Sequence, residues 1–144
     1  MFLVKLRAWV PRDKEMFHVR SILFDKELVA LTYDEDDEPA FFEHYNDIVL
    51  MQYTWLYDDK GIEIYIGDIV EVHHKSETTT PYLSEVIMSH DGALVHSHPA
   101  HRVLGFGEWE QLSKYSDYGN GGKFDVRCKI VGNIYENPEL LEVE

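Results

Sequence analysis

The sequence lacks the features that cross-link, anchor or target many proteins. Cys128 is the single cysteine, so no disulfide can form within the chain. A membrane-spanning helix needs about 18 consecutive apolar residues, and no apolar run in the sequence comes close to that length. Lys5 and Arg7 interrupt the apolar start of the chain, which does not match a signal peptide. We therefore expect a protein of the reducing cytoplasm, without a membrane association.

Basic residues are scarce. The chain has 13 lysines and arginines against 27 aspartates and glutamates, a net charge of −14. A field of this sign repels phosphate backbones, so direct nucleic-acid binding is not expected. It favours two other interpretations, which are simple solubility or docking onto a basic partner. Mimicry of a nucleic acid is a special case of the second.

Motifs of catalysis and of cofactor binding are also missing. The sequence has no CxxC or HExxH metal motif, no GxSxG nucleophile elbow and no phosphate-binding glycine loop. Cys128 alternates with the apolar Val126 and Ile130, so we expect it to be a buried packing residue rather than a nucleophile. We expect no cofactor, and the sequence does not favour an enzyme.

Histidines provide the alternative interpretation, because six of the eight lie between His73 and His101. His96 and His98 would share one face of a strand, with His101 nearby, and imidazole is a good zinc or copper ligand. These three are weak metal candidates, since no supporting motif accompanies them. The same residues are also explained as an exposed polar set or as a pH-responsive surface.

Alternation of apolar and polar residues dominates the rest of the chain and predicts a mostly β fold, an antiparallel meander with short helical turns. Gly61 is expected to supply a positive φ in a tight turn. The predicted strands include Leu3–Trp9, Met16–Phe24, Leu28–Tyr33, Asp47–Trp55, Glu85–Ser89, Ala93–Ser97 and Phe124–Tyr135. The predicted turns lie at Asp25–Glu27, Asp58–Gly61, Gly67–Asp68 and His90–Gly92.

Two helical turns are predicted, one over Ala40–Tyr45 and one at the end of the chain. Asn137 suits a helix N-cap and Pro138 suits the first helical position. The acidic run Asp34–Glu38 precedes the first of these turns. It is read either as a solvated loop or as a patch for a basic partner or a cation.

Aromatic residues bracket the Asp58–Gly61 turn. Tyr53, Trp55, Tyr57 and Tyr65 are interpreted either as a cross-strand set that seals a hairpin or as a binding platform. The candidate interaction surface therefore comprises Asp34, Glu35, Asp36, Asp37, Glu38, Trp55 and Tyr57.

Three segments together resemble one known family. They are Leu6-Arg-Ala-Trp9 near the start, Leu50–Thr54 continuing to Gly67-Asp-Ile-Val70, and Ile130-Val-Gly-Asn-Ile-Tyr-Glu-Asn-Pro-Glu-Leu140 near the end. In order and spacing these motifs resemble the YopX family of phage and prophage proteins. Two positions depart from the family pattern: Trp55 stands where the family usually has glycine, and Tyr57 where it usually has lysine.

The resemblance implies a β-rich phage or prophage protein of the bacterial cytoplasm, and it implies no catalytic residues. The motif residues read as structural: Trp9, Tyr53, Gly61, Gly67, Asp68, Gly132, Asn137 and Pro138. We expect one family domain over 1–144, built from two packed β subdomains of about 1–57 and 58–144, with an SH3-like barrel in the second half.

The favoured function is that of a non-enzymatic accessory protein that binds another protein, with homo-oligomers as one form of such binding. The alternative is a metal-binding or enzymatic module that uses the His73–His101 region.

Overall fold

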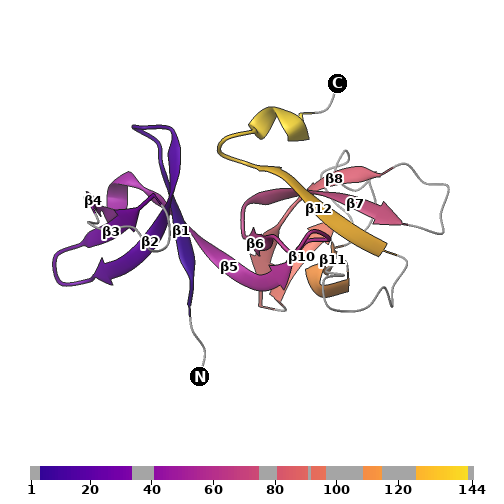
Figure 1. The fold of residues 1–144 in the computed structure, drawn as a ribbon, viewed down its shortest axis with the longest axis horizontal. Helices are drawn as coiled ribbons and strands as arrows, with labels where there is room; N and C mark the ends of the chain where they lie inside the picture. The colour runs from indigo at the N-terminus through magenta and orange to yellow at the C-terminus, as the bar shows by residue number, and fades with distance from the viewer. Residues whose placement is uncertain are drawn as a thin grey trace. The chain divides into compact units, whose positions relative to one another are not determined.

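The computed structural model describes residues 4–33, 41–74, 81–90, 92–96, 109–114 and 126–142. Its regular elements are antiparallel strands and single 3-10 turns, which confirms the mostly β prediction (Figure 1). The chain divides into two compact units, Met1–Tyr53 and Thr54–Glu144. Among the described residues there is no helix long and apolar enough to cross a membrane.

Unit 1 is a meander in which neighbouring strands lie in the order β4-β3-β2-β1-β5. The alternation of apolar residues explains its core, because side chains two apart on a strand share one face. Its elements are β1 (Leu6–Val10), β2 (Glu15–Leu23), β3 (Leu28–Thr32), β4 (Phe41–His44), the 3-10 turn η1 (Tyr45–Asp47) and the first part of β5 (Val49–Tyr57). The buried cluster comprises Ala8, Val10, Phe17, Val29, Leu31 and Ile48.

The hairpin expected at Asp25–Glu27 is confirmed, since β2 pairs with β3 up to Leu23 and Leu28. The helical turn expected over Ala40–Tyr45 is wrong. Phe41 lies opposite Leu31, and Glu43 opposite Val29, so this segment pairs as the edge strand β4. The 3-10 turn follows only at Tyr45.

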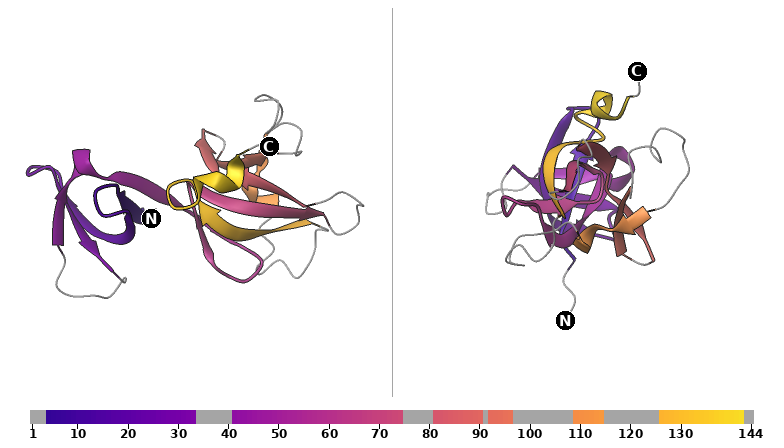
Figure 2. Two further views of the ribbon diagram at one scale, coloured as in Figure 1. Left: turned by 90° about the horizontal axis from the view of Figure 1, so that it is seen from above. Right: turned by 90° about the vertical axis from the view of Figure 1, so that its right-hand side faces the viewer.

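Unit 2 contains the end of β5, its partner β6 (Glu63–Tyr65) and two three-stranded sheets, ordered β12-β7-β8 and β11-β10-β9. Figure 2 shows β12, in yellow, beside β7. The remaining elements are β7 (Asp68–His74), β8 (Tyr82–Glu85), β9 (Ile87–Ser89), β10 (Gly92–His96), β11 (Trp109–Gln111), η2 (Leu112–Lys114), β12 (Val126–Asn133) and η3 (Pro138–Leu141). The core comprises Ile64, Val70, Val72, Tyr82, Val86, Ala93, Val95, Leu112 and Cys128.

The hairpin expected near residue 91 is confirmed by the pairing of Gly92 with Ser89. Asp91 itself lies outside the described residues. The SH3-like barrel stays a prediction, because the pairings establish three antiparallel arrangements and not a closed barrel.

A buried carboxylate holds the turn between β5 and β6. Asp58 is fully buried, and its Oδ1 accepts hydrogen bonds from the backbone N–H groups of Lys60 and Ile62, both at 2.9 Å. Its Oδ2 accepts from the N–H of Ile130 on β12 at 3.1 Å. Gly61 has φ 81°, as the sequence predicts. The Asp58 side chain therefore fixes the turn and ties it to a strand about 70 residues later.

Candidate functional site

Two adjoining hollows in unit 1 form the candidate site, and both are lined by Arg12 and Glu43. The first, of about 460 Å³, is lined by Val10, Pro11, Arg12, Glu43, Asn46, Asp47, Ile48 and Val49. The second, of about 450 Å³, is lined by Arg12, Asp13, Glu15, Phe17, Tyr33, Phe41 and Glu43. We call these two hollows together the Glu43 cleft.

The turn between β1 and β2 places Arg12. The backbone N–H groups of Asp13 and Lys14 both donate to the carbonyl of Val10, at 3.2 and 2.8 Å. Lys14 then takes φ 54°, which reverses the chain into β2. This tight reversal leaves Arg12 at the tip of the turn with its side chain 66% exposed.

Glu43 comes from the core-facing side of β4, opposite Val29. Its side chain is only 10% exposed, so its charge needs a compensating partner. Arg12 supplies that partner, because its Nη2 donates to Oε1 of Glu43. Among the described residues, Oε2 of Glu43 accepts no hydrogen bond.

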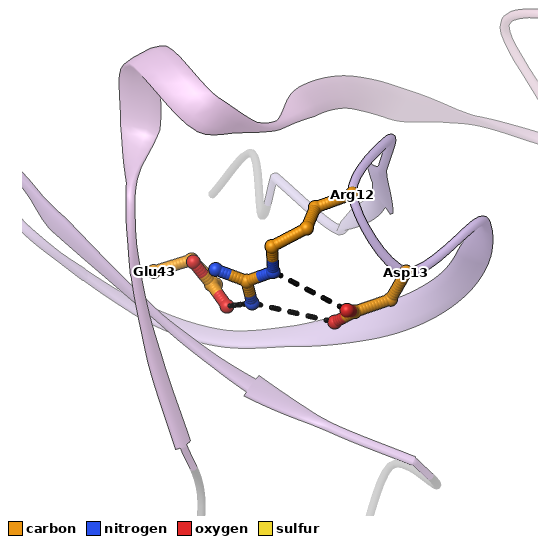
Figure 3. A network of polar contacts seen from close by, with 3 residues as sticks. All are labelled: Arg12, Asp13 and Glu43. Atoms are coloured by element: carbon orange, nitrogen blue, oxygen red, sulfur yellow. Dashed lines mark hydrogen bonds and ion pairs between the residues drawn. The ribbon is translucent and has the colours of Figure 1, made fainter.

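The guanidinium group of Arg12 lies between two carboxylates, as Figure 3 shows. Its Nε and Nη2 donate to the two oxygens of Asp13 at 3.3 and 3.4 Å. The bonds to Asp13 first, and to Glu43 second, raise the pKa of Arg12 further above its usual range. The cleft thus holds a cation between one exposed and one largely buried acid.

An aromatic wall borders the second hollow. The rings of Phe17 and Phe41 meet edge to face with centroids 4.9 Å apart, and Tyr33 lies 5.1 Å from Phe17. Tyr33 is 65% exposed, whereas Phe17 is buried. Ring faces beside carboxylates form a site that attracts cationic side chains.

The residues that line the Glu43 cleft carry a net negative charge, as the whole chain does. Arg12 is the one basic residue of the lining, against the acidic Asp13, Glu15, Glu43 and Asp47. A lining of carboxylates and aromatic rings can attract and hold a cationic side chain.

Of the three predicted metal candidates, only His96 lies among the described residues. The ring of His96 stacks on Trp109 with centroids 3.9 Å apart. His98 and His101 lie outside the described residues, as do Asp34, Glu35, Asp36, Asp37 and Glu38. No group of three or more His, Cys, Asp or Glu side chains that could hold a metal occurs in the ranges that the structure describes.

Trp55 and Tyr57 lie on the hairpin of β5 and β6, where they are 45% and 37% exposed beside the 52% exposed Ile62. Trp55 has φ 65°, a left-handed conformation that is costly for a residue with a Cβ. This hairpin therefore presents three partly exposed apolar side chains, one of them on a strained backbone.

Residues of the three motifs that carry the family resemblance pack in the interior or close turns of the backbone. Trp9 and Tyr53 are buried, and Gly67 has φ 96° in the turn before β7. The buried Asp68 accepts from the N–H of Tyr65 at 2.8 Å, which closes that turn.

Near the end of the chain, Oδ1 of Asn137 accepts from the N–H of Asn133 at 3.3 Å. Asn137 precedes the 3-10 turn that starts at Pro138, but its side chain makes no capping bond there. The backbone of Gly132 approaches the same amide so closely that an added Cβ would lie 2.5 Å from its oxygen.

Sequence reasoning missed Arg12 and Glu43 as a pair. Each has an ordinary local context, a polar turn and a short strand, and they lie 31 residues apart. The signal that could have found Glu43 is its spacing of two from Phe41, which puts both side chains on one face once that segment is assigned as a strand and not a helical turn.

The comparisons with known proteins agree with the fold. The family model described as YopX protein matches residues 5–142. The crystal structure of protein EF1440 from Enterococcus faecalis is similar with a TM-score of 0.60 and 24% identity, over 99% of this chain and 100% of that chain. The crystal structure of protein yopX from Bacillus subtilis has a TM-score of 0.60 and 17% identity, over 97% of both chains. No curated protein matches. At these identities the two structures share the fold with this chain, and the match over residues 5–142 shows that the chain belongs to the YopX family.

Proposed function

We propose that this protein is a non-enzymatic binding module that takes a basic segment of a partner protein into the Glu43 cleft. The observation that carries the proposal is the largely buried Glu43 carboxylate, which both hollows reach and which already holds a guanidinium group. A carboxylate in such a place favours an occupant that brings positive charge.

Charge and aromatic surface support the same occupant. The net charge of −14 steers a basic partner toward the molecule at low salt. The aromatic wall formed by Phe17, Tyr33 and Phe41 can cover the apolar stem of a lysine or arginine. Family membership supports the wider setting that we propose, a phage or prophage accessory protein in the bacterial cytoplasm.

Binding of short basic peptides tests the proposal. Fluorescence anisotropy would follow a labelled eight-residue peptide with alternating arginine and glycine, at low and at physiological salt. We expect saturable binding that weakens with salt, because opposite charges are screened. The Glu43→Gln variant is expected to bind about tenfold more weakly, since it loses a charge-assisted hydrogen bond.

Glu139→Gln is the matched control, because it removes one carboxylate from an exposed position in η3 of unit 2. Its affinity should stay within about twofold of the parent, as expected for an exposed charge that does not line the cleft. Equal effects of the two substitutions would show general attraction to an acidic surface and would refute the cleft. Absence of binding at low salt would refute the function itself.

A further inference from the structure

We infer that the Glu43 cleft selects arginine, and that Arg12 occupies in the unbound protein the position that a partner's guanidinium group takes. This inference rests on the proposed function and specifies the ligand and the way in which the site is closed. Arg12 is then an internal ligand that a partner displaces.

The contacts of Arg12 show that the cleft accommodates a guanidinium group. One nitrogen, Nη2, is shared between Oε1 of Glu43 and Oδ2 of Asp13. The group lines both hollows, so it stands where an entering side chain from either hollow would have to lie. Among the described residues the bond from Arg12 uses only Oε1 of Glu43, and a forked arginine–carboxylate pair would use both oxygens.

The exposure of Arg12 and its neighbour Asp13 favours displacement of Arg12 from the cleft. The side chain of Arg12 is 66% exposed and that of Asp13 is 41% exposed, and the two residues are neighbours in the turn. Asp13 can therefore move with Arg12 and keep its hydrogen bonds after displacement. Glu43 is different, because its 10% exposed carboxylate needs a new cation as soon as Arg12 withdraws.

A guanidinium ligand fits better than an ammonium ligand. Its planar fork can bond both oxygens of Glu43, whereas the ammonium group of lysine acts as a compact point charge. The flat face of arginine also stacks well on aromatic rings, and Tyr33 offers an exposed one beside the cleft. The site is therefore expected to prefer arginine to lysine at equal charge.

Peptide affinities for Arg12 variants test the displacement. We expect Arg12→Ala to bind the arginine peptide about tenfold more tightly, because the peptide no longer competes with an internal charge-assisted bond. Arg127→Ala is the matched control: Arg127 is a 44% exposed arginine of unit 2 that lies 3.9 Å from Asp59. It makes the same change in net charge, and we expect a change within about twofold.

The ligand preference is read from a second peptide in which lysine replaces every arginine. The gain on Arg12→Ala should be clearly smaller for the lysine peptide. An equal gain for both peptides would refute guanidinium selection. Parent-like affinity of Arg12→Ala for the arginine peptide would refute displacement, while the proposed function would stand on the binding of the parent protein.

A readout without any peptide separates the two proposals. N-acetylarginine amide at millimolar concentration should raise the unfolding temperature of Arg12→Ala more than that of the parent, because it refills the vacated position. N-acetyllysine amide serves as the equal-charge comparison and should do so less. If both variants respond alike to the arginine compound, the inference fails whether or not basic peptides bind.

Discussion

Replacing Asp58 with alanine should strongly destabilise unit 2. The substitution removes a fully buried carboxylate and leaves three backbone N–H groups, those of Lys60, Ile62 and Ile130, without their acceptor. These three bonds are part-buried, and a hydrogen bond to a charged group contributes about 1.5–3 kcal/mol, so we expect a loss of about 3 kcal/mol or more. An asparagine side chain would restore one oxygen for two of the donors, so Asp58→Asn should cost about half as much.

Asp59→Ala is the matched control, because it removes the neighbouring carboxylate. The Asp59 side chain is 18% exposed, and its nearest cation is the Nε of Arg127 at 3.9 Å. A partly exposed pair at that distance contributes less than about 1 kcal/mol. Both substitutions therefore remove one negative charge from the same turn, but only Asp58→Ala is expected to leave three backbone donors without an acceptor.

Urea unfolding followed by far-ultraviolet circular dichroism and by tryptophan fluorescence would measure both losses. Because the chain has two compact units, a free energy is taken only where the two probes coincide. Amide hydrogen exchange gives the local readout: the N–H groups of Ile62 and Ile130 should lose protection in Asp58→Ala. Equal costs for the two alanine variants, or unchanged protection at both amides, would refute the assigned role of Asp58.

Four further predictions concern unit 2. Burial, with a smaller contribution from Asp58 and Asp59, raises the pKa of Cys128 from 9.0 to about 12, so iodoacetamide at pH 8 should modify the folded protein about a thousandfold more slowly than the urea-unfolded chain. Because folding raises the pKa of Cys128, the contribution of its protonated thiol to the free energy of unfolding is complete below about pH 9. That contribution is lost as the pH rises toward about 12, which urea titrations across that range would detect. Trp55→Gly should be more stable than Trp55→Ala by about 1 kcal/mol, the reverse of the usual order in a strand, because only glycine relieves φ 65°. Gly132→Ala should cost about 1–3 kcal/mol in thermal or urea unfolding, since its Cβ would displace the Asn137 amide, and little of that cost should remain in an Asn137→Gly background.

Local patterns predicted the parts of the fold that depend on neighbours in sequence. The two strand-like runs Met16–Phe24 and Leu28–Tyr33 on either side of a polar turn gave the correct hairpin. Gly61 was assigned a positive φ for the reason that the structure shows, a tight turn. Burial of Cys128 followed from its apolar neighbours on the strand.

The strand β4 and the Arg12–Glu43 pair were not predicted, because both depend on strand pairing between residues far apart in the sequence. Residues 41–44 form a strand because β3 offers them a free edge, and no local signal in Phe41–His44 reports that edge. The Arg12–Glu43 pair depends on that same strand, so it could not be predicted while the segment was taken as a helical turn. The error in β4 and the omission of the site therefore have one cause.

Trp55 shows how a departure from a family pattern can carry structural information. Its φ of 65° is the conformation that favours glycine, the residue that the resemblance described in the sequence analysis implies at this position. A tryptophan in this left-handed conformation carries a cost in strain. The sequence marked Trp55 as a departure from the pattern but did not predict the strained backbone behind it.

The residues that maintain the fold are different from those that we propose bind a partner. Asp58, Gly61 and Asp68 close turns, and Gly132 makes room for Asn137, so the motifs that identify the family are used by the backbone. Arg12 and Glu43 belong to a surface turn and an edge strand of unit 1, and neither is part of the described hydrophobic core of that unit. A relative can therefore keep the whole fold and lose the Glu43 cleft. Family membership alone does not transfer the binding that we propose, and each chain has to be tested for a carboxylate at the position of Glu43 and for an arginine that covers it.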